Sequence, residues 1–225
     1  LNIQNNIFNV VIKYKIKNFT FIGSSCIYPK KNKMPIKEEY ILSGPLEKTN
    51  YAYAVAKIAG VKAVQAINQQ YKTNYKAAML TNMYGPNDNF DLKTSHVIPA
   101  LIRKIYEAKI KNKKKVEIWG TGKPKRDLLF VEEAAKAILM YHEKKTKHQI
   151  LNIGSGKELS IKQIAKIICD VVGFNGKLSF NKKYPDGTFR KVLDVSKIKK
   201  LGWKNSVNFK SGIKKTLDWY IKNCV

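Results

Sequence analysis

Short apolar runs alternate with longer helical patterns along most of this chain, and this alternation limits its fold more than any other feature. The clearest run, Phe21 to Gly23, is followed at once by Ser24, Ser25 and Cys26. A buried strand that ends in small polar residues is typical of a parallel sheet, in which ligands bind at the carboxyl ends of the strands. The alternation therefore predicts an α/β fold with a parallel sheet.

The pattern can be followed along the whole chain. We expect strands over residues 18–23, 75–82, 116–119, 126–130, 149–153 and 177–180. We expect helices over residues 2–16, from 49 or 50 to 71, and over 96–109, 131–143, 161–171 and 209–223. The first helix would carry its apolar residues on one side, at Ile3, Ile7, Val10, Val11 and Tyr14. Ser95 and Ser160 are predicted N-caps, because a serine hydroxyl can accept a hydrogen bond from the first helical turn.

Tyr53 and Lys57 are the most informative polar pair in the chain. They stand four residues apart in an alanine-rich helical pattern, so they share one face of the helix, one turn apart. A nearby ammonium favours the ionised form of a phenol. A tyrosine tuned in this way can donate a proton to a carbonyl oxygen while a hydride reaches the carbon. Such a pair alone would be an ordinary surface contact, but Ser24 at the end of the preceding strand favours the catalytic interpretation.

The chain carries a formal charge of +27, from 43 lysines and arginines against 16 acidic residues. The lysines are scattered, with one cluster at Lys111–Lys115, and arginine is scarce. Because arginine is the better reader of phosphates and bases, we attribute the charge to solvated lysine-rich faces and expect no nucleic-acid partner. A nucleic-acid binder stays an alternative that rests on charge alone.

The lengths of the apolar runs and the number of cysteines bear on membrane association and on the cellular compartment. No apolar run reaches about 18 residues, and Leu1–Asn6 does not read as a signal peptide, so we expect no membrane association. The three cysteines, Cys26, Cys169 and Cys224, have no metal-like spacing. An odd number of cysteines argues for a reducing compartment, so we predict a cytoplasmic protein with no metal site.

Several runs of residues resemble a known family. Ser24 with the Tyr53-x-x-x-Lys57 pattern resembles the short-chain dehydrogenase/reductase superfamily, in its extended nucleotide-sugar branch. Further runs resemble GDP-L-fucose synthase, and the likeness extends over nearly the whole chain. They are Gly23–Pro29, Lys37–Tyr40, Gly44–Glu47, Tyr84–Phe90, Ser95–Ile102, Trp119–Gly122, Pro185–Thr188 and Leu193–Ser196.

This resemblance implies a fold, a reaction and partners. The fold would be a Rossmann-like doubly wound parallel sheet with a smaller α/β substrate domain. Residues 1–92 and 125–153 would form the NADP-binding part, and residues 93–124 and 154–225 the GDP-sugar part. The reaction would be epimerisation at C3 and C5 of GDP-4-keto-6-deoxy-D-mannose, followed by reduction at C4 with NADPH. The family also implies a homodimer, through the helix before Ser24 and the helix that carries Tyr53.

The resemblance also assigns roles to residues. The catalytic set would be Ser24, Cys26, Tyr53, Lys57 and His96. The cofactor would be bound by Ile22, Gly23, Ser24, Ser25, Tyr53, Lys57, Leu80, Thr81, Asn82, Met83 and His96. The substrate would be bound by Lys104, Trp119, Arg126 and Asp186. A thiol and an imidazole both exchange protons near neutral pH, which suits an epimerising pair such as Cys26 and His96.

Other interpretations stay open. Cys26 alone would more often be a small buried apolar residue, and Asp186 before Gly187 could be a plain turn. Because no glycine-rich phosphate turn precedes Phe21, we expect the chain to enter the cofactor domain in its middle, as an amino-terminally truncated form. The alternatives are another nucleotide-sugar epimerase or dehydratase, and a non-catalytic remnant that lacks the cofactor cradle.

Overall fold

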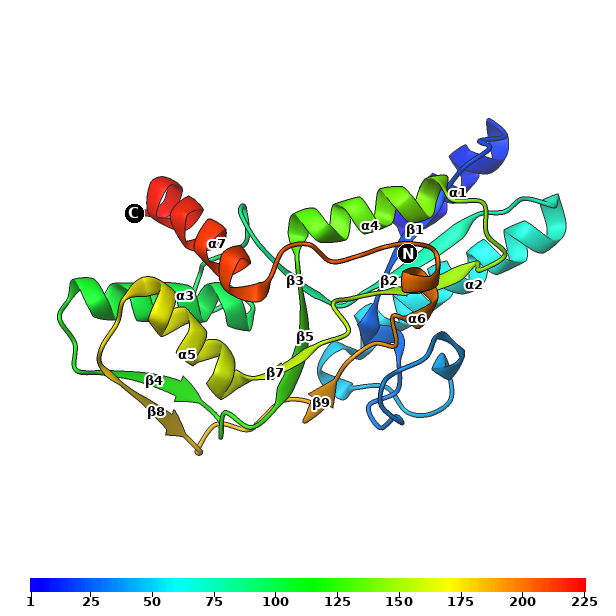
Figure 1. Ribbon diagram of the computed structural model, residues 1–225. Helices are drawn as coiled ribbons and strands as arrows, with labels where there is room; N and C mark the ends of the chain where they lie inside the picture. Colours follow the sequence, from blue (N-terminus) through cyan, green and yellow to red (C-terminus); the bar gives the residue numbers. More distant parts are fainter. The chain divides into compact units, whose positions relative to one another are not determined.

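The computed structural model describes residues 1–225 and divides into two compact units (Figure 1). The first unit comprises residues 1–81, 134–156 and 192–204, and the second comprises residues 82–133, 157–191 and 205–225. Both units mix helices with parallel strands, so the predicted α/β class is confirmed. The predicted cofactor and substrate domains are defined by the ligand each would bind, and they stay a prediction.

The first unit is built on a three-stranded parallel sheet in the order β1-β2-β6. Its strands are β1 (Thr20–Ser24), β2 (Lys76–Leu80) and β6 (Ile150–Ile153). Its α-helices are α1 (Asn2–Lys13), α2 (Tyr51–Tyr71), most of α4 (Val131–Glu143) and α6 (Ser196–Lys200), and its 3₁₀ helices are η1 (Ser25–Ile27), η2 (Glu38–Tyr40) and η3 (Lys48–Asn50). The register pairs Ser24 with Leu80 and Leu80 with Ile153, so the three strands end at one edge.

Helix α2 lies close to β1 because glycine occupies the contact. A Cβ on Gly60 would collide with the ring of Phe21. Every residue of β2 is buried, so this strand forms the centre of the unit's core. The close approach of α2 to β1 sets the position of the residues that α2 presents at the strand ends.

Helix α1 buries a different side from the one that its apolar stripe predicts. Phe8 and Val11 face the core, and the ring of Phe8 packs edge-on against Phe19. The other residues of the predicted stripe are exposed, by fractions of 80%, 45%, 51% and 65% at Ile3, Ile7, Val10 and Tyr14. The stripe exists, but one aromatic residue outside it decides which side faces the sheet.

The second unit contains two small sheets. One joins β5 (Lys125–Phe130) to β3 (Asn82–Tyr84) and β9 (Arg190–Lys191) in parallel, and to β7 (Glu158–Ser160) in antiparallel. The other is a parallel pair of β4 (Lys115–Trp119) and β8 (Lys177–Asn181), which run side by side in Figure 1. The helices are α3 (Val97–Ile110), α5 (Ile161–Val172) and α7 (Phe209–Cys224). Their apolar sides share one core with Val116 and Ile118 of β4.

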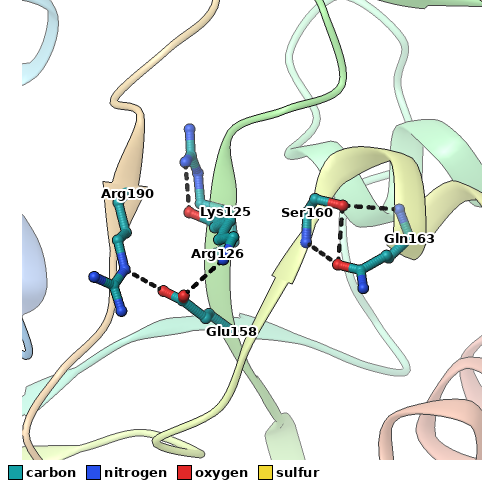
Figure 2. Close-up of polar contacts among 6 residues, drawn as sticks. All are labelled: Lys125, Arg126, Glu158, Ser160, Gln163 and Arg190. Carbon is teal, nitrogen blue, oxygen red and sulfur yellow. Dashed lines mark hydrogen bonds and ion pairs between the residues drawn. The ribbon is translucent and has the colours of Figure 1, made fainter.

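Some predicted elements and caps differ from the structure. The strand expected over residues 75–82 is two strands, because β2 ends at Leu80 and β3 begins at Asn82 in a different sheet. The predicted cap at Ser160 is confirmed, since its Oγ accepts from the backbone of Gln163, whose side chain bonds back to the backbone of Ser160 (Figure 2). The predicted cap at Ser95 is wrong: His96 is the N-cap of α3, and the buried Ser95 hydroxyl has no hydrogen-bond partner.

No helix of the structure combines the length and apolar character that crossing a membrane requires. None of the three cysteines forms a disulfide. Burial raises the pKa of Cys169, which lies on the inner side of α5, to about 11.

A buried polar network joins the segment after β1 to the central sheet of the first unit. The Tyr28 hydroxyl donates to Oδ1 of Asn152 at 2.6 Å, and Nδ2 of Asn152 donates to the Ile36 carbonyl at 2.9 Å. The Asn152 backbone N–H donates to Glu38, whose carboxylate also pairs with Lys197 at 2.8 Å. Burial raises the pKa of Tyr28 far above its ordinary value, so this hydroxyl keeps its proton as a donor. The network fixes the residues that follow Cys26 against β6.

We predict that Asn152→Ala destabilises the first unit by about 2–3 kcal/mol, because it leaves the buried Tyr28 hydroxyl and the Ile36 carbonyl without their partner. The measurement is urea unfolding followed by circular dichroism. Asn74→Ala is the matched control, since that side chain makes an exposed bond to Thr146 and its loss should cost no more than about 0.5 kcal/mol. Equal unfolding midpoints for the two variants would contradict the structural role of Asn152.

Candidate functional site

Ser24 and Cys26 lie where β1 passes into a tight turn. Ser24 is the last residue of the strand and the N-cap of η1, and its Oγ accepts from the Cys26 backbone N–H at 3.2 Å. Ser25 is buried, and Cys26 is partly exposed and forms no disulfide. The predicted polar end of the strand therefore presents a hydroxyl and a thiol from adjacent positions of one turn.

Tyr53 and Lys57 lie one turn apart on α2, with Nζ of Lys57 at 5.7 Å from the centre of the Tyr53 ring. Nζ also donates to the Ile22 carbonyl of β1 at 2.8 Å and lies 5.2 Å from the centre of the Phe21 ring. Burial lowers the pKa of Lys57 below its ordinary value. Tyr53 itself is 49% exposed. The ammonium is thus fixed between the helix and the strand, while the phenol faces outward.

The remaining first-unit candidates lie at the same sheet edge. Gly23 pairs with Met79, and a Cβ on Gly23 would collide with the Met79 side chain. Leu80 and Thr81 are buried beside the end of β1, and the Thr81 backbone donates to the Ile153 carbonyl at 2.9 Å. The Ile22 side chain is 38% exposed, which leaves an apolar surface next to the carbonyl that Lys57 binds.

The other candidates belong to the second unit. Asn82 and Met83 are exposed residues of β3, and His96, also exposed, precedes the first turn of α3. The His96 side chain forms no capping bond to that turn. Asn82 and Met83 thus lie in a strand and His96 at a helix start, and the roles of all three stay predictions.

Lys104 and Trp119 are in contact within the second unit. Nζ of Lys104, on α3, lies 4.8 Å from the centre of the Trp119 ring at the end of β4, which is a cation–π distance. Trp119 also stacks on Tyr184, with ring centres 4.4 Å apart and planes inclined by 13°. Tyr184 was not among the residues predicted from the sequence, although an aromatic residue in a polar segment beside Pro185 is a visible signal.

Asp186 is bonded to the turn that follows β4. Its two carboxylate oxygens accept from the Thr121 backbone at 2.8 Å and from the Thr121 hydroxyl at 2.6 Å. The hydroxyl bond is the main cause that lowers the pKa of Asp186 below its ordinary value. Gly120 has φ +81, and a Cβ there would collide with the Asp186 carboxylate, so this contact requires glycine. The predicted substrate residue therefore holds two loops together.

Arg126 is held by backbone carbonyls at one end of its guanidinium. Nη1 donates to the carbonyls of Lys125 and Thr188 at 2.8 and 2.5 Å. Burial lowers the pKa of Arg126, and the carboxylate of Asp186 opposes that effect. Because side chains alternate along a strand, Arg126 lies on the opposite side of β5 from Lys125.

Figure 2 shows the other side of β5, where Glu158 lies between Lys125 and Arg190. Glu158 bonds Nζ of Lys125 at 3.1 Å and Nε of Arg190 at 2.6 Å. These bonds link the side chains of β5, β7 and β9 and lower the pKa of Glu158, with the bond from Arg190 as the main cause. This exposed cluster ties the strands together without using the guanidinium of Arg126.

Comparisons with known proteins identify relatives of this chain. Residues 1–154 match the NAD dependent epimerase/dehydratase family. The chain is 46% identical to the probable GDP-L-fucose synthase 1 of Oryza sativa subsp. japonica, over 100% of the chain and 69% of that protein. It is 40% identical to the GDP-L-fucose synthase of Escherichia coli, over 98% of the chain and 72% of that protein.

A solved structure shows the same arrangement of elements. The GDP-L-fucose synthetase from Naegleria fowleri, in a crystal structure bound to NADP, superposes with a TM-score of 0.92. The superposition covers 99% of this chain and 71% of that one, at 29% identity.

Proposed function

This chain belongs to the NAD dependent epimerase/dehydratase family, and we propose that within it the chain acts as a GDP-L-fucose synthase. The substrate would be GDP-4-keto-6-deoxy-D-mannose and the cofactor NADP(H). The observation that carries the proposal is the Lys57 ammonium, fixed against β1 at the Ile22 carbonyl and one helical turn from the outward-facing Tyr53. That arrangement serves the reduction of a ketone, and the similarity along the whole chain specifies which ketone.

The edge of the first-unit sheet has the chemistry that a nicotinamide cofactor needs. Lys57 offers a positive charge beside the strand, and the exposed part of Ile22 offers an apolar surface for a ring. Leu80 and Thr81 end the neighbouring strand, in the position where parallel sheets bind ligands. NADPH bound there would supply the hydride for the C4 carbon.

Reduction requires a proton for the oxygen that becomes a hydroxyl. Tyr53 would donate it, and the positive charge of Lys57 would stabilise the phenolate that remains. Ser24, which already accepts from the Cys26 backbone, would donate its own hydroxyl proton to the same C4 oxygen. Two donors on one oxygen also stabilise an enolate, so the same residues would support the earlier epimerisation.

Epimerisation needs a base and an acid. Protons at C3 and C5 are acidic because the ketone at C4 accepts the charge as an enolate. Cys26 and His96 would remove and return these protons, with the thiolate or imidazole taking the proton and the protonated partner replacing it. Cys26 is partly exposed and forms no disulfide, as this role requires. A catalytic thiol must stay reduced, which fits a cytoplasmic location.

We predict that Cys26→Ser lowers solvent-deuterium incorporation at C3 and C5 by about 100-fold or more, because a hydroxyl is a far weaker acid than a thiol. The measurement is mass spectrometry or NMR of the sugar after incubation in D₂O. Cys224→Ser removes a different thiol, at the exposed end of α7, and should exchange at the wild-type rate. Wild-type labelling in the Cys26 variant would remove this residue from the mechanism.

We predict that Tyr53→Phe lowers the rate of NADPH oxidation by about 100- to 10,000-fold, because the ring stays while the proton donor is lost. Absorbance at the nicotinamide band measures this rate. Tyr51→Phe on the same helix is the control, since Tyr51 is also exposed and its ring is likewise kept. An unchanged rate in the Tyr53 variant would rule out its role as the proton donor.

We also propose that the chain forms a homodimer through α1 and α2. Ile3, Ile7 and Val10 leave an apolar stripe on α1 open to solvent. The Gln4 side chain donates to the Ala56 carbonyl of α2, so the two helices are neighbours within the first unit. Val55 adds a further exposed apolar side chain on α2, and exposed apolar side chains on neighbouring helices are typical of an interface.

We expect Ile7→Glu to convert the dimer to a monomer, because the new charge would be buried against the second copy. Sedimentation equilibrium measures the mass directly. Leu139→Glu, at an exposed apolar position of α4, is the control and should leave the mass unchanged. The interface proposal fails if the wild type is already a monomer at micromolar concentration, or if both variants stay dimeric.

A further inference from the structure

Trp119 and Tyr184 form an exposed aromatic stack in the second unit. Their ring centres are 4.4 Å apart and nearly parallel, yet Trp119 is 55% exposed and Tyr184 is 41% exposed. Large aromatic side chains normally contribute to stability by being buried. A pair that is ordered by stacking but left open to solvent offers a flat apolar surface to a ligand.

The two rings are held in place by the backbone around them. Trp119 ends β4 and pairs with Asn181, the last residue of β8. The Asn181 carbonyl accepts from the backbone of Gly120 at 2.9 Å and from that of Tyr184 at 3.3 Å. Beyond Tyr184, the two bonds from Thr121 to Asp186 close the loop against the turn after Trp119. The stack is therefore pre-organised by bonds on both sides of Tyr184.

Two cationic side chains contact Trp119 or the loop that carries Tyr184. The Lys104 ammonium lies 4.8 Å from the centre of the Trp119 ring. The guanidinium of Arg126 contacts the loop that carries Tyr184, because Nη1 bonds the Thr188 carbonyl and a Cβ on Gly187 would lie 3.1 Å from Nη2. An aromatic surface flanked by lysine and arginine matches a nucleoside diphosphate, whose base stacks on rings and whose phosphates bind cations.

We propose that Tyr184, stacked on Trp119, is a nucleobase-binding residue of this chain, and that the Thr121–Asp186 contact positions it. The base of the nucleotide sugar lies on the exposed aromatic surface, and the diphosphate faces Arg126 and Lys104. Asp186 acts here as a positioning residue, since its two carboxylate oxygens accept the backbone and hydroxyl bonds from Thr121. The inference rests on the proposed function and names the part of its site that selects the base.

The test compares ligands with and without a base. Isothermal titration calorimetry of the wild-type chain should give tighter binding of GDP than of UDP, because a purine presents the larger stacking surface, and weakest binding of inorganic pyrophosphate. Tyr184→Ala should weaken GDP binding about 10-fold or more and leave pyrophosphate binding unchanged. Tyr184→Phe keeps the ring and should bind GDP as the wild type does. Thr121→Val, which removes the hydroxyl bond to Asp186, should weaken GDP binding and again spare pyrophosphate.

The outcomes separate this inference from the proposed function. Wild-type GDP affinity in Tyr184→Ala overturns the inference, and so does an equal loss of GDP and pyrophosphate binding, which would mean that the loop has collapsed. Tighter binding of UDP than of GDP contradicts the proposed function, while a loss of UDP binding in Tyr184→Ala would still support the stacking role. A wild-type chain that binds no nucleoside diphosphate overturns both.

Discussion

One hydrogen bond, from the ammonium of Lys57 to the Ile22 carbonyl, couples the helix that carries the candidate acid to the strand that carries the candidate hydroxyl and thiol. The bond forms because Gly60 lets α2 approach β1. A lysine in this position costs some desolvation, which is visible in its lowered pKa. The bond holds the ammonium at the Ile22 carbonyl, one helical turn from Tyr53 and two residues before Ser24 in the chain. If the helix were displaced along the strand by one turn, the same residues would no longer share this edge.

The parts of the site that sequence reasoning predicted are those set by local spacing. A four-residue interval on a helix places Tyr53 and Lys57 together whatever surrounds them. The polar end of β1 and the N-cap at Ser160 are likewise determined by a few neighbouring residues. Contacts between distant residues carry no such signal. The bonds from Tyr28 to Asn152 and from Thr121 to Asp186 join residues that are 124 and 65 positions apart.

The predictions that were wrong also concern features set by contacts between distant residues. The single strand expected over residues 75–82 is a continuous β-prone run, and only the pairing partners show that Leu80 and Asn82 belong to different sheets. The predicted apolar stripe of α1 is present, but Phe8, which packs against Phe19 and Phe21, decides which side of the helix is buried. The short strands β7 and β9 have no apolar pattern of their own. They exist because β5 lies between them, and Glu158 links their side chains.

The large positive charge of the chain affects how it meets anionic ligands. Lysines and arginines number 43 against 16 acidic residues, so the chain attracts anions of every kind, and this field raises the rate of encounter. A dispersed field cannot distinguish one nucleotide from another, because phosphate groups are common to all of them. Selection has to come from groups fixed in space, and the backbone-held guanidinium of Arg126 and the ordered rings of Trp119 and Tyr184 are such groups. Charge that brings a nucleotide sugar to the surface and a rigid aromatic platform that recognises its base are therefore separate properties of this chain, and substitutions at one should leave the other intact.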